Sequence, residues 1–167
     1  MSPVRPDLIE CLVFRVGDAG RVEHLLIRRA DDRIFPGIWQ PVTGGVDPGE
    51  RVPLAALREV EEETGLGATE VEAFYDLEQV GSFFDEENDA IVNSVIFAVR
   101  VHPGAAPKVS GEHVDLRWCD RAEAERLSVW PPYRDSYDLV ERLAGDPDLA
   151  RWFALDPGGR RSARPPR

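Results

Sequence analysis

Three glutamates in one short stretch of the sequence have a spacing that suits metal chemistry. Glu59, Glu62 and Glu63 would lie on one turn of a helix, which places their carboxylates close together on one face. Because like charges at this spacing repel one another, either some of the groups hold protons or a cation neutralises them. Oxygen ligands suit Mg2+ or Mn2+, hard cations that substrate phosphates also bind. A solvated helix face would have the same composition, so the flanking residues must decide between the two interpretations.

A glycine-containing loop, residues 44–50, leads into this acidic stretch. Its glycines permit a tight turn, so backbone groups and the start of the following helix can approach an anion closely. Arg58 is placed to pair with Glu62 one turn further on, or to reach Glu50 across the loop. These neighbours favour a cation-assisted site for an anionic substrate.

The segment 44–66 resembles the Nudix box, Gly-x5-Glu-x7-Arg-Glu-U-x-Glu-Glu-x-Gly-U, in which U is an aliphatic residue. Every specified position is filled, by Gly44, Glu50, Arg58, Glu59, Val60, Glu62, Glu63, Gly65 and Leu66. The resemblance implies the Nudix α/β/α sandwich with a mixed β-sheet. It also implies hydrolysis of a phosphoanhydride bond, by attack of water on a phosphorus with the help of Mg2+ or Mn2+.

The resemblance also implies a role for each box residue. Glu59, Glu62 and Glu63 are expected to bind the divalent cation, and Arg58 to orient a glutamate. Glu50 is expected to support the loop and the metal site. The backbone carbonyl of Thr43, just before the box, is a further candidate ligand.

The general base is left open, because Nudix enzymes use either a box glutamate or a glutamate from a later loop. Glu112, in the sequence Ser-Gly-Glu-His, resembles that later glutamate and is also a candidate metal ligand. An ordinary loop carboxylate is the alternative interpretation. His113 is expected to be a structural hydrogen-bonding group. The acidic run 85–89 could extend the metal site or form a charged hairpin tip.

Residues outside the box would select the substrate. The sequence is similar to bacterial dihydroneopterin triphosphate pyrophosphatases over segment 38–45, and again at Glu112, His113, Trp118, Trp130 and Arg134. Trp39 and Gln40 could stack on a heterocycle and hydrogen-bond it, although Trp39 could instead belong to the core. Arg29 and Phe84 are further candidate substrate-binding residues.

The best match for the substrate is therefore a nucleoside triphosphate or dihydroneopterin triphosphate. Dinucleoside polyphosphates and nucleotide sugars stay open as alternatives. ADP-ribose is disfavoured, because Gly81 stands where hydrolases of that substrate usually have a proline. A Nudix-like module that only binds its ligand is a different class, but such modules usually lose box glutamates, which this chain keeps.

The elements that would position these residues alternate along the chain. Residues 30–37 are predicted to form a loop before a short segment, Ile38–Thr43. Strands are predicted at Asp7–Val16, Val22–Arg29, Val71–Val80, Ile91–Val101 and Leu116–Cys119, and helices at Arg121–Leu127 and Tyr133–Ala144. The first two strands should form a hairpin. Interleaved strands and helices indicate a layered α/β domain.

The helix that bears the glutamates is predicted to begin at Pro53 and to end at Gly65. An inward stripe is predicted at Leu54, Leu57, Val60 and Thr64. The three glutamates should lie off this stripe, leaving one packed face and one acidic face.

Length and composition bound the other properties. The 167 residues favour a single domain over residues 1–157, followed by a disordered basic tail over residues 158–167. The net charge of -11 argues against binding duplex nucleic acid and leaves a small phosphorylated molecule as the expected partner. The sequence shows neither an apolar run of membrane-spanning length nor a signal peptide, so we expect a cytoplasmic monomer or homodimer that does not bind membranes. Cys11 and Cys119 are expected to be buried free thiols.

Overall fold

Strand β1 (Leu8–Val16) lies at the centre of a mixed sheet in the computed structural model, which describes residues 3–162. β6 (Ala90–Val101) pairs with β1 in parallel along one edge. Two strands share the other edge, since β4 (Val42–Gly45) pairs with Leu8–Cys11 and β2 (Val22–Arg29) pairs with Val13–Val16. The predicted hairpin of the first two strands is therefore confirmed, and the divided edge sets β4 apart from β2.

The full strand order is β3-β2-β1-β6-β5-β8, with β4 paired to β1 and β7 paired to β2. The other strands are β3 (Trp39–Gln40), β5 (Val71–Asp85), β7 (His113–Cys119) and β8 (Ala154–Leu155). The helices are α1 (Val52–Thr64), α2 (Arg121–Leu127), α3 (Tyr133–Gly145) and α4 (Pro147–Phe153), and a short 3-10 turn, η1 (Asp18–Gly20), joins β1 to β2.

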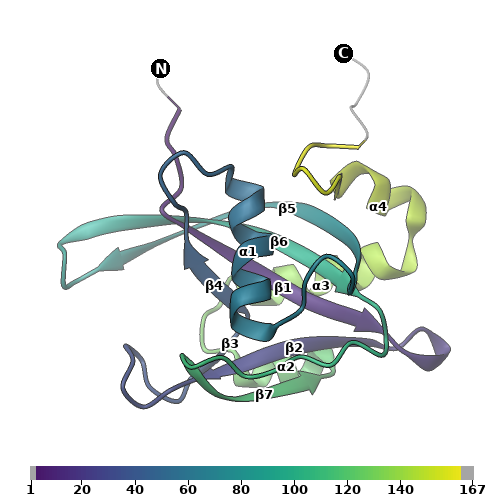
Figure 1. Cartoon of the computed structure of the whole chain (residues 1–167), viewed down its shortest axis with the longest axis horizontal. Coiled ribbons are helices and arrows are strands. Elements are labelled where there is room, and N and C mark those ends of the chain that lie inside the picture. Colours follow the sequence, from purple (N-terminus) through teal and green to yellow (C-terminus); the bar gives the residue numbers. More distant parts are fainter. Residues whose placement is uncertain (1–2, 163–167) are drawn as a thin grey trace.

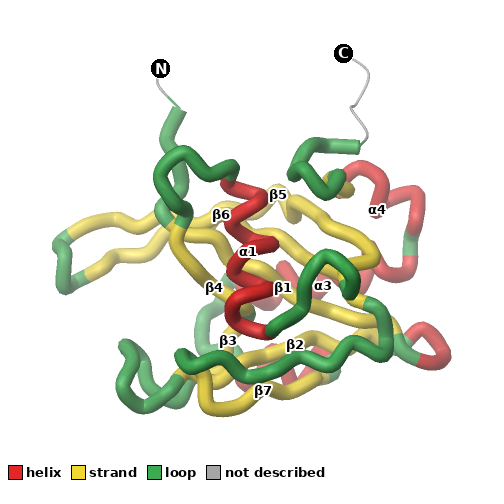
Figure 2. The backbone as a smooth tube through the Cα atoms, in the orientation of Figure 1, coloured by secondary structure: helices red, strands yellow, loops and turns green. Residues whose placement is uncertain are grey.

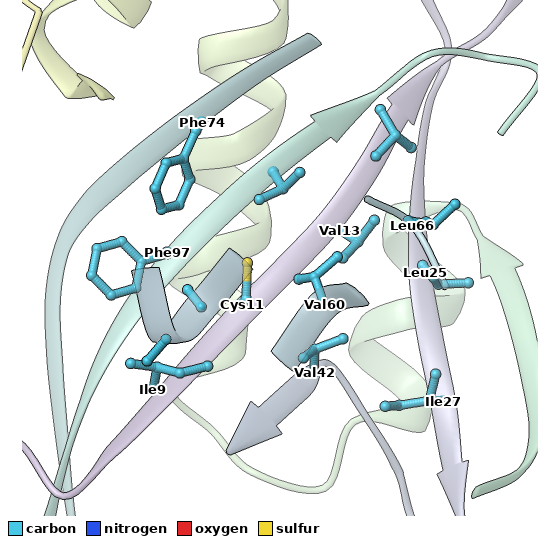
Figure 3. Packing of buried hydrophobic residues seen from close by; sticks show 14 of the residues in the cluster. Ile9, Cys11, Val13, Leu25, Ile27, Val42, Val60, Leu66, Phe74 and Phe97 are labelled. Atoms are coloured by element: carbon cyan, nitrogen blue, oxygen red, sulfur yellow. The ribbon is translucent and has the colours of Figure 1, made fainter. Parts of the chain in front are cut away.

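The helices lie on both faces of the sheet (Figure 1). α1 packs on one face, where a hydrophobic cluster contains Val60 of α1, Cys11 and Val13 of β1, and Val42 of β4 (Figure 3). α2 and α3 pack on the other face, over a second cluster around Leu12 and Phe14 of β1. The predicted α/β/α sandwich with a mixed sheet is confirmed.

Helix α1 forms where it was predicted, and Gly65 ends it in the left-handed conformation, with φ 71°. The predicted inward stripe is wrong in detail. Ala55 and Ala56 are fully buried, because α1 approaches β1 and β4 closely, whereas Leu54 and Leu57 are only partly buried. The prediction that Glu63 would lie off the packed face is also wrong, since Glu63 is buried.

β5 and β6 extend further than predicted. They form a long hairpin that projects beyond the helices (Figure 2), and the acidic run 85–89 makes its tip. The Asp85 carboxylate accepts hydrogen bonds from the backbone N–H groups of Glu87 and Asn88, which closes the turn. This matches the hairpin-tip interpretation of that run.

The C-terminal segment was incompletely predicted, because α4 and β8 follow α3. Residues 158–162 do not fit the predicted disordered tail: the N–H of Asp156 donates to the carbonyl of Arg160, and the Arg161 guanidinium binds Asp76 and Glu78 of β5. Gly159 packs so closely on Pro53 that a β-carbon there would lie 2.7 Å from the Pro53 Cβ. The rest of the expected tail, residues 163–167, lies outside the described residues.

Cys11 and Cys119 are both buried and unpaired, as expected. No helix between residues 3 and 162 is both long enough and apolar enough to cross a membrane.

Candidate active site

Arg58 connects the loop 44–50 to the acidic face of α1. Its Nε and Nη2 donate to the two carboxylate oxygens of Glu50, at 2.9 and 3.0 Å. Its Nη1 donates to Glu59 at 2.6 Å and to Glu62 at 3.2 Å, and Nη2 also reaches the carbonyl of Gly45 at 2.9 Å. The two pairings left open by the sequence, with Glu50 and with Glu62, therefore form together. The hydrogen bonds from Arg58 lower the pKa of Glu50 and so keep it charged.

The carboxylate of Glu59 lies directly against the backbone of Gly44, and a β-carbon at residue 44 would collide with it. The first glycine of the box thus leaves space for the first of the three box glutamates. Burial raises the pKa of Glu59, although its hydrogen bond to Arg58 acts in the opposite direction.

Glu63 is the most unusual group of the site. Its residue is 6% exposed, and its Oε2 has no hydrogen-bond partner. Burial, reinforced by the charges of Glu59 and Glu112, raises its pKa to about 8, while the backbone of Thr43 and the charge of Arg29 act in the opposite direction. An unpartnered buried carboxylate oxygen is costly unless a proton or a cation satisfies it.

Glu62 differs from the other two, because its side chain is 59% exposed and its contact is the ion pair with Arg58. The three glutamates predicted to share one face therefore occupy three environments: Glu63 is buried, Glu59 is partly covered and held by Arg58, and Glu62 faces solvent.

Glu112 lies in the loop immediately before β7. Its charge contributes to the raised pKa of both Glu59 and Glu63, so the structure brings it to the box glutamates. Its carboxylate is 59% exposed and lies 3.5 Å from the Arg33 guanidinium. Arg33, in the loop 30–37, was not a candidate from the sequence, because one arginine in a polar loop gives no spacing signal.

Arg29 ends β2 beside this group. Its Nε is buried without a hydrogen-bond partner, and its charge acts on both Glu63 and His113. His113 is buried, its Nδ1 lies 3.3 Å from the hydroxyl of Ser110, and burial lowers its pKa. A neutral histidine bonded to a serine fits the structural role expected for it.

The other candidate substrate residues are more scattered. Gln40 is buried and donates from Nε2 to the hydroxyl of Thr43 at 3.1 Å. Trp39 packs against the second hydrophobic cluster, and the Arg117 guanidinium lies 5.0 Å from its ring centroid. Part of the Trp39 ring is therefore packed against the hydrophobic core. Phe84 is 58% exposed and lies in the projecting β5–β6 hairpin, opposite Ile91.

The donor set fits a hard divalent cation. Within residues 3–162, no three acidic or histidine side chains already converge as a preformed cage. Glu59 is instead held by Arg58, while Glu63 keeps a free buried oxygen. Glu59, Glu63 and Glu112 nevertheless lie close enough for their charges to act on one another, and all three offer oxygen only.

The mixed α/β/α sandwich carries its glutamates on the helix that follows a glycine loop, which is the arrangement that the Nudix box predicts. The sequence profile of the NUDIX domain matches residues 9–140, so the chain belongs to the Nudix family and is a Nudix pyrophosphohydrolase.

Two relatives show how the similarity is distributed. The chain is 35% identical over 100 residues to the nucleoside triphosphatase NudI of Escherichia coli, covering 57% of this chain and 71% of that protein. It is also 35% identical over 119 residues to the octanoyltransferase of Myxococcus xanthus, covering 71% of this chain but 31% of that protein. The chain therefore spans about a third of the length of the Myxococcus relative.

Solved structures share the fold. The Caenorhabditis elegans Ap4A hydrolase has a TM-score of 0.70 at 22% identity, over 85% of this chain and 100% of that one. The Escherichia coli dihydroneopterin triphosphate pyrophosphohydrolase has a TM-score of 0.64 at 24% identity, over 78% of this chain and 92% of that one.

Proposed function

We propose that this chain is a divalent-cation-dependent pyrophosphohydrolase that acts on a nucleoside triphosphate or on dihydroneopterin triphosphate. The observation that supports this most directly is the buried Glu63 carboxylate, with one oxygen unpartnered beside Glu59 and Glu112. A group of this kind is stable in its charged form only when a cation binds it.

In this proposal Glu59, Glu62 and Glu63 hold Mg2+ or Mn2+, with the carbonyl of Thr43 as a further ligand. When bound, the cation neutralises charge on the phosphoryl oxygens and lowers the pKa of coordinated water. Arg58 keeps the carboxylates of Glu50 and Glu59 oriented through three hydrogen bonds, two to Glu50 and one to Glu59. Arg29, whose buried Nε lacks a partner, offers a donor to a phosphate oxygen.

Glu112 is the proposed general base. Water attacks the phosphorus, its oxygen forms the new P–O bond, its proton passes to Glu112, and the bridging oxygen leaves with the bonding electron pair. The ion pair with Arg33 orients the Glu112 side chain. If a box glutamate were the base instead, Glu112→Gln would keep its kcat and the shape of its pH profile.

Two comparisons support the choice of substrate. NudI, with 35% identity, is named a nucleoside triphosphatase, and the neighbour of TM-score 0.64 is named a dihydroneopterin triphosphate pyrophosphohydrolase. We also propose a cytoplasmic location and no duplex nucleic acid partner, which the two free buried thiols and the net charge of -11 support.

The test measures pyrophosphate release from purified protein with nucleoside triphosphates, dihydroneopterin triphosphate, Ap4A and ADP-ribose. Activity should require Mg2+ or Mn2+ and disappear with EDTA. Glu59→Gln and Glu63→Gln should each lower kcat by roughly 100-fold or more, because each removes a charged oxygen ligand. Glu61→Gln is the matched control in the same acidic run and should keep normal kcat. Full turnover in EDTA, or equal loss in all three variants, would contradict the proposal.

A further inference from the structure

The outer part of β5 has an open edge. β6 pairs with one side of the strand, whereas β8 pairs with the other side only at Phe74 and Tyr75. Within residues 3–162, the segment 80–85 therefore has no strand on its second side. This segment belongs to the part of the hairpin that projects beyond the helices (Figure 2). A two-stranded hairpin is marginally stable by itself in water, and an open edge is a template for another strand.

Large apolar side chains are exposed on the same part of the hairpin. Val80, Phe83, Phe84 and Ile91 all have about half or more of their surface exposed. Phe84 lies directly opposite Ile91, and Val80 shares their face because side chains alternate along a strand. Single exposed apolar residues are ordinary, but four of them together on one projecting element are typical of an interaction surface.

The sequence of this edge is complementary to a second copy of itself. From Val80 onward it reads Val-Gly-Ser-Phe-Phe. If two copies pair in antiparallel fashion about a two-fold axis at Ser82, Val80 of each copy lies opposite Phe84 of the other. Gly81 then lies opposite Phe83. Cross-strand pairs of an aromatic with a β-branched residue stabilise a sheet, and an aromatic ring opposite a glycine covers the space left by its missing side chain.

Neighbouring registers lose this match. Opposite residues in an antiparallel pair point to the same face, so a two-fold axis perpendicular to the sheet must pass through a residue position. Moving the axis to residue 81 places Phe84 opposite the charged Glu78. Moving it to residue 83 places Val80 opposite the charged Glu86. The register centred on Ser82 avoids both of these pairs.

The same register directs the acidic tip of the second copy toward α3. It places Asp85 of that copy opposite Gln79, and residues 86–89 of the tip lie just beyond. Gln79 faces α3, where its Oε1 accepts a hydrogen bond from the hydroxyl of Ser136 at 2.6 Å. The tip therefore lies on the α3 side of the sheet.

A groove beside Gln79 carries positive charge on that side. Arg134 and Arg142 of α3 line it together with Gln79, and we call it the arginine groove. Within residues 3–162, neither of these two arginines forms an ion pair. Two of the three carboxylates in the groove pair with Arg121, so Asp135 alone offsets the two arginines. Four of the five tip residues are acidic, and this opposite charge favours a second copy as the partner.

We propose that this chain forms a homodimer through the open edge of β5, with the two edges paired in antiparallel fashion about Ser82. The two sheets then form one continuous sheet, and each acidic tip lies in the arginine groove of the other copy. The interface has an apolar centre and a charged rim, as is common in protein interfaces. Phe84 serves the contact between copies in this arrangement, instead of the substrate. The inference is independent of the proposed function, because pairing of the strands needs no substrate.

The first test is disulfide cross-linking of the purified full-length protein. Ser82→Cys places one thiol of each copy at the two-fold axis, where opposite Cα atoms are about 4.5 to 5.5 Å apart, within the range that a disulfide spans. Mild oxidation should therefore link the two copies. Ala90→Cys, exposed on the other strand of the same hairpin, is the matched control and should not cross-link. Cys11 and Cys119 are buried and should not contribute.

The second test is analytical ultracentrifugation, which measures the Kd of the dimer. The wild type should be a dimer at micromolar concentrations. Phe84→Lys should raise the Kd about 100-fold or more, because each dimer carries the change twice and each lost aromatic contact costs roughly tenfold. Arg142→Glu should raise it about tenfold, since the new charge repels the acidic tip. Val114→Lys, at an exposed valine of β7, is the control and should leave the Kd unchanged.

A wild type that stays monomeric at every concentration overturns the inference and leaves the edge to another occupant, such as residues 163–167 or a different protein. A dimer that Ser82→Cys does not cross-link, or whose Kd is unchanged by Phe84→Lys or by Arg142→Glu, also overturns it, because the copies then meet through another surface. Melting temperatures identify any variant that fails to fold, and the remaining variants decide in that case.

Discussion

The carboxylate of Glu59 occupies the space in which a side chain of residue 44 would stand. Gly44→Ala should therefore displace Glu59 and lower kcat by roughly 100-fold, because a misplaced ligand costs transition-state stabilisation. Steady-state kinetics with Mg2+ would measure the loss.

Gly45→Ala is the control for this change, since the next residue of the same strand has open space around its Cα. Its kcat should stay within about threefold of the wild type. Comparable losses in both variants would show that loop flexibility, and not the position of Glu59, is what residue 44 provides.

Arg58 binds Glu50 through Nε and Nη2 and also binds Glu59 and Glu62 through Nη1. Lysine keeps the charge but cannot make this planar set of bonds, so Arg58→Lys should lower kcat/KM by about 10- to 100-fold. Arg100→Lys, at the ion pair with Glu72 on the sheet, should leave kcat/KM unchanged. Normal activity in Arg58→Lys would mean that charge alone is needed at this position.

The raised pKa of Glu63 predicts that the metal-free protein loses stability as pH rises. Between the ordinary value of 4.5 and the folded value of about 8, the folded state holds a proton that the unfolded state has released, so stability falls across this window. Glu63→Gln should remove that fall and be more stable than the wild type at pH 8 by about 1 to 3 kcal/mol. Urea unfolding at pH 5 and pH 8 measures it.

Added Mg2+ should stabilise the wild type more at pH 8 than at pH 5, and should stabilise Glu63→Gln less at either pH, because the cation binds the charged carboxylate. If the free energies of unfolding of wild type and variant differ by the same amount at pH 5 and pH 8 without metal, the raised pKa of the buried Glu63 carboxylate is contradicted.

His24 predicts the opposite dependence at lower pH. Burial, reinforced by the charge of Arg121, lowers its pKa to about 4, and neither ring nitrogen has a hydrogen-bond partner. The unfolded state binds a proton near pH 6.5 that the folded state refuses, so this contribution to stability is lost as pH falls from about 6.5 to 4.

His24→Phe should keep the edge-to-face contact with Tyr137, now at 4.8 Å between centroids, and should lessen the loss of stability in acid. The free energy of unfolding of the variant minus that of the wild type is measured at pH 7.5 and again at pH 5, and the two differences are compared. A constant difference would show that His24 does not titrate in this range.

The C-terminal turn is predicted to stabilise the fold through Arg161, which binds the carbonyl of Trp152 at 2.7 Å and Asp76 at 3.0 Å. Arg161→Ala should lower the melting temperature by a few degrees, equivalent to about 1 kcal/mol for partly exposed ion pairs. Arg160→Ala, an exposed neighbour, should not change it. Equal melting temperatures would mean that the turn contributes little to stability.

The sequence by itself determined the family and the layers of the fold. The box spacing required a glycine loop, then an arginine and three glutamates on one helix, and α1 follows from that local spacing, as do the two candidate partners of Arg58, Glu50 and Glu62. Strand β2 was predicted to the residue, because a short apolar run preceded by turn residues is a local signal.

Only the tertiary structure decided how the glutamates differ. Glu63 is buried and Glu62 is exposed because of how closely α1 packs on β4. The spacing of residues along a helix does not predict how closely that helix approaches the sheet. Arg33 beside Glu112, Ser94 beside Glu10 and Gly159 on Pro53 likewise join residues far apart in the chain. Local spacing fixes which residue types a turn or helix presents, whereas long-range packing sets their burial, partners and charge state.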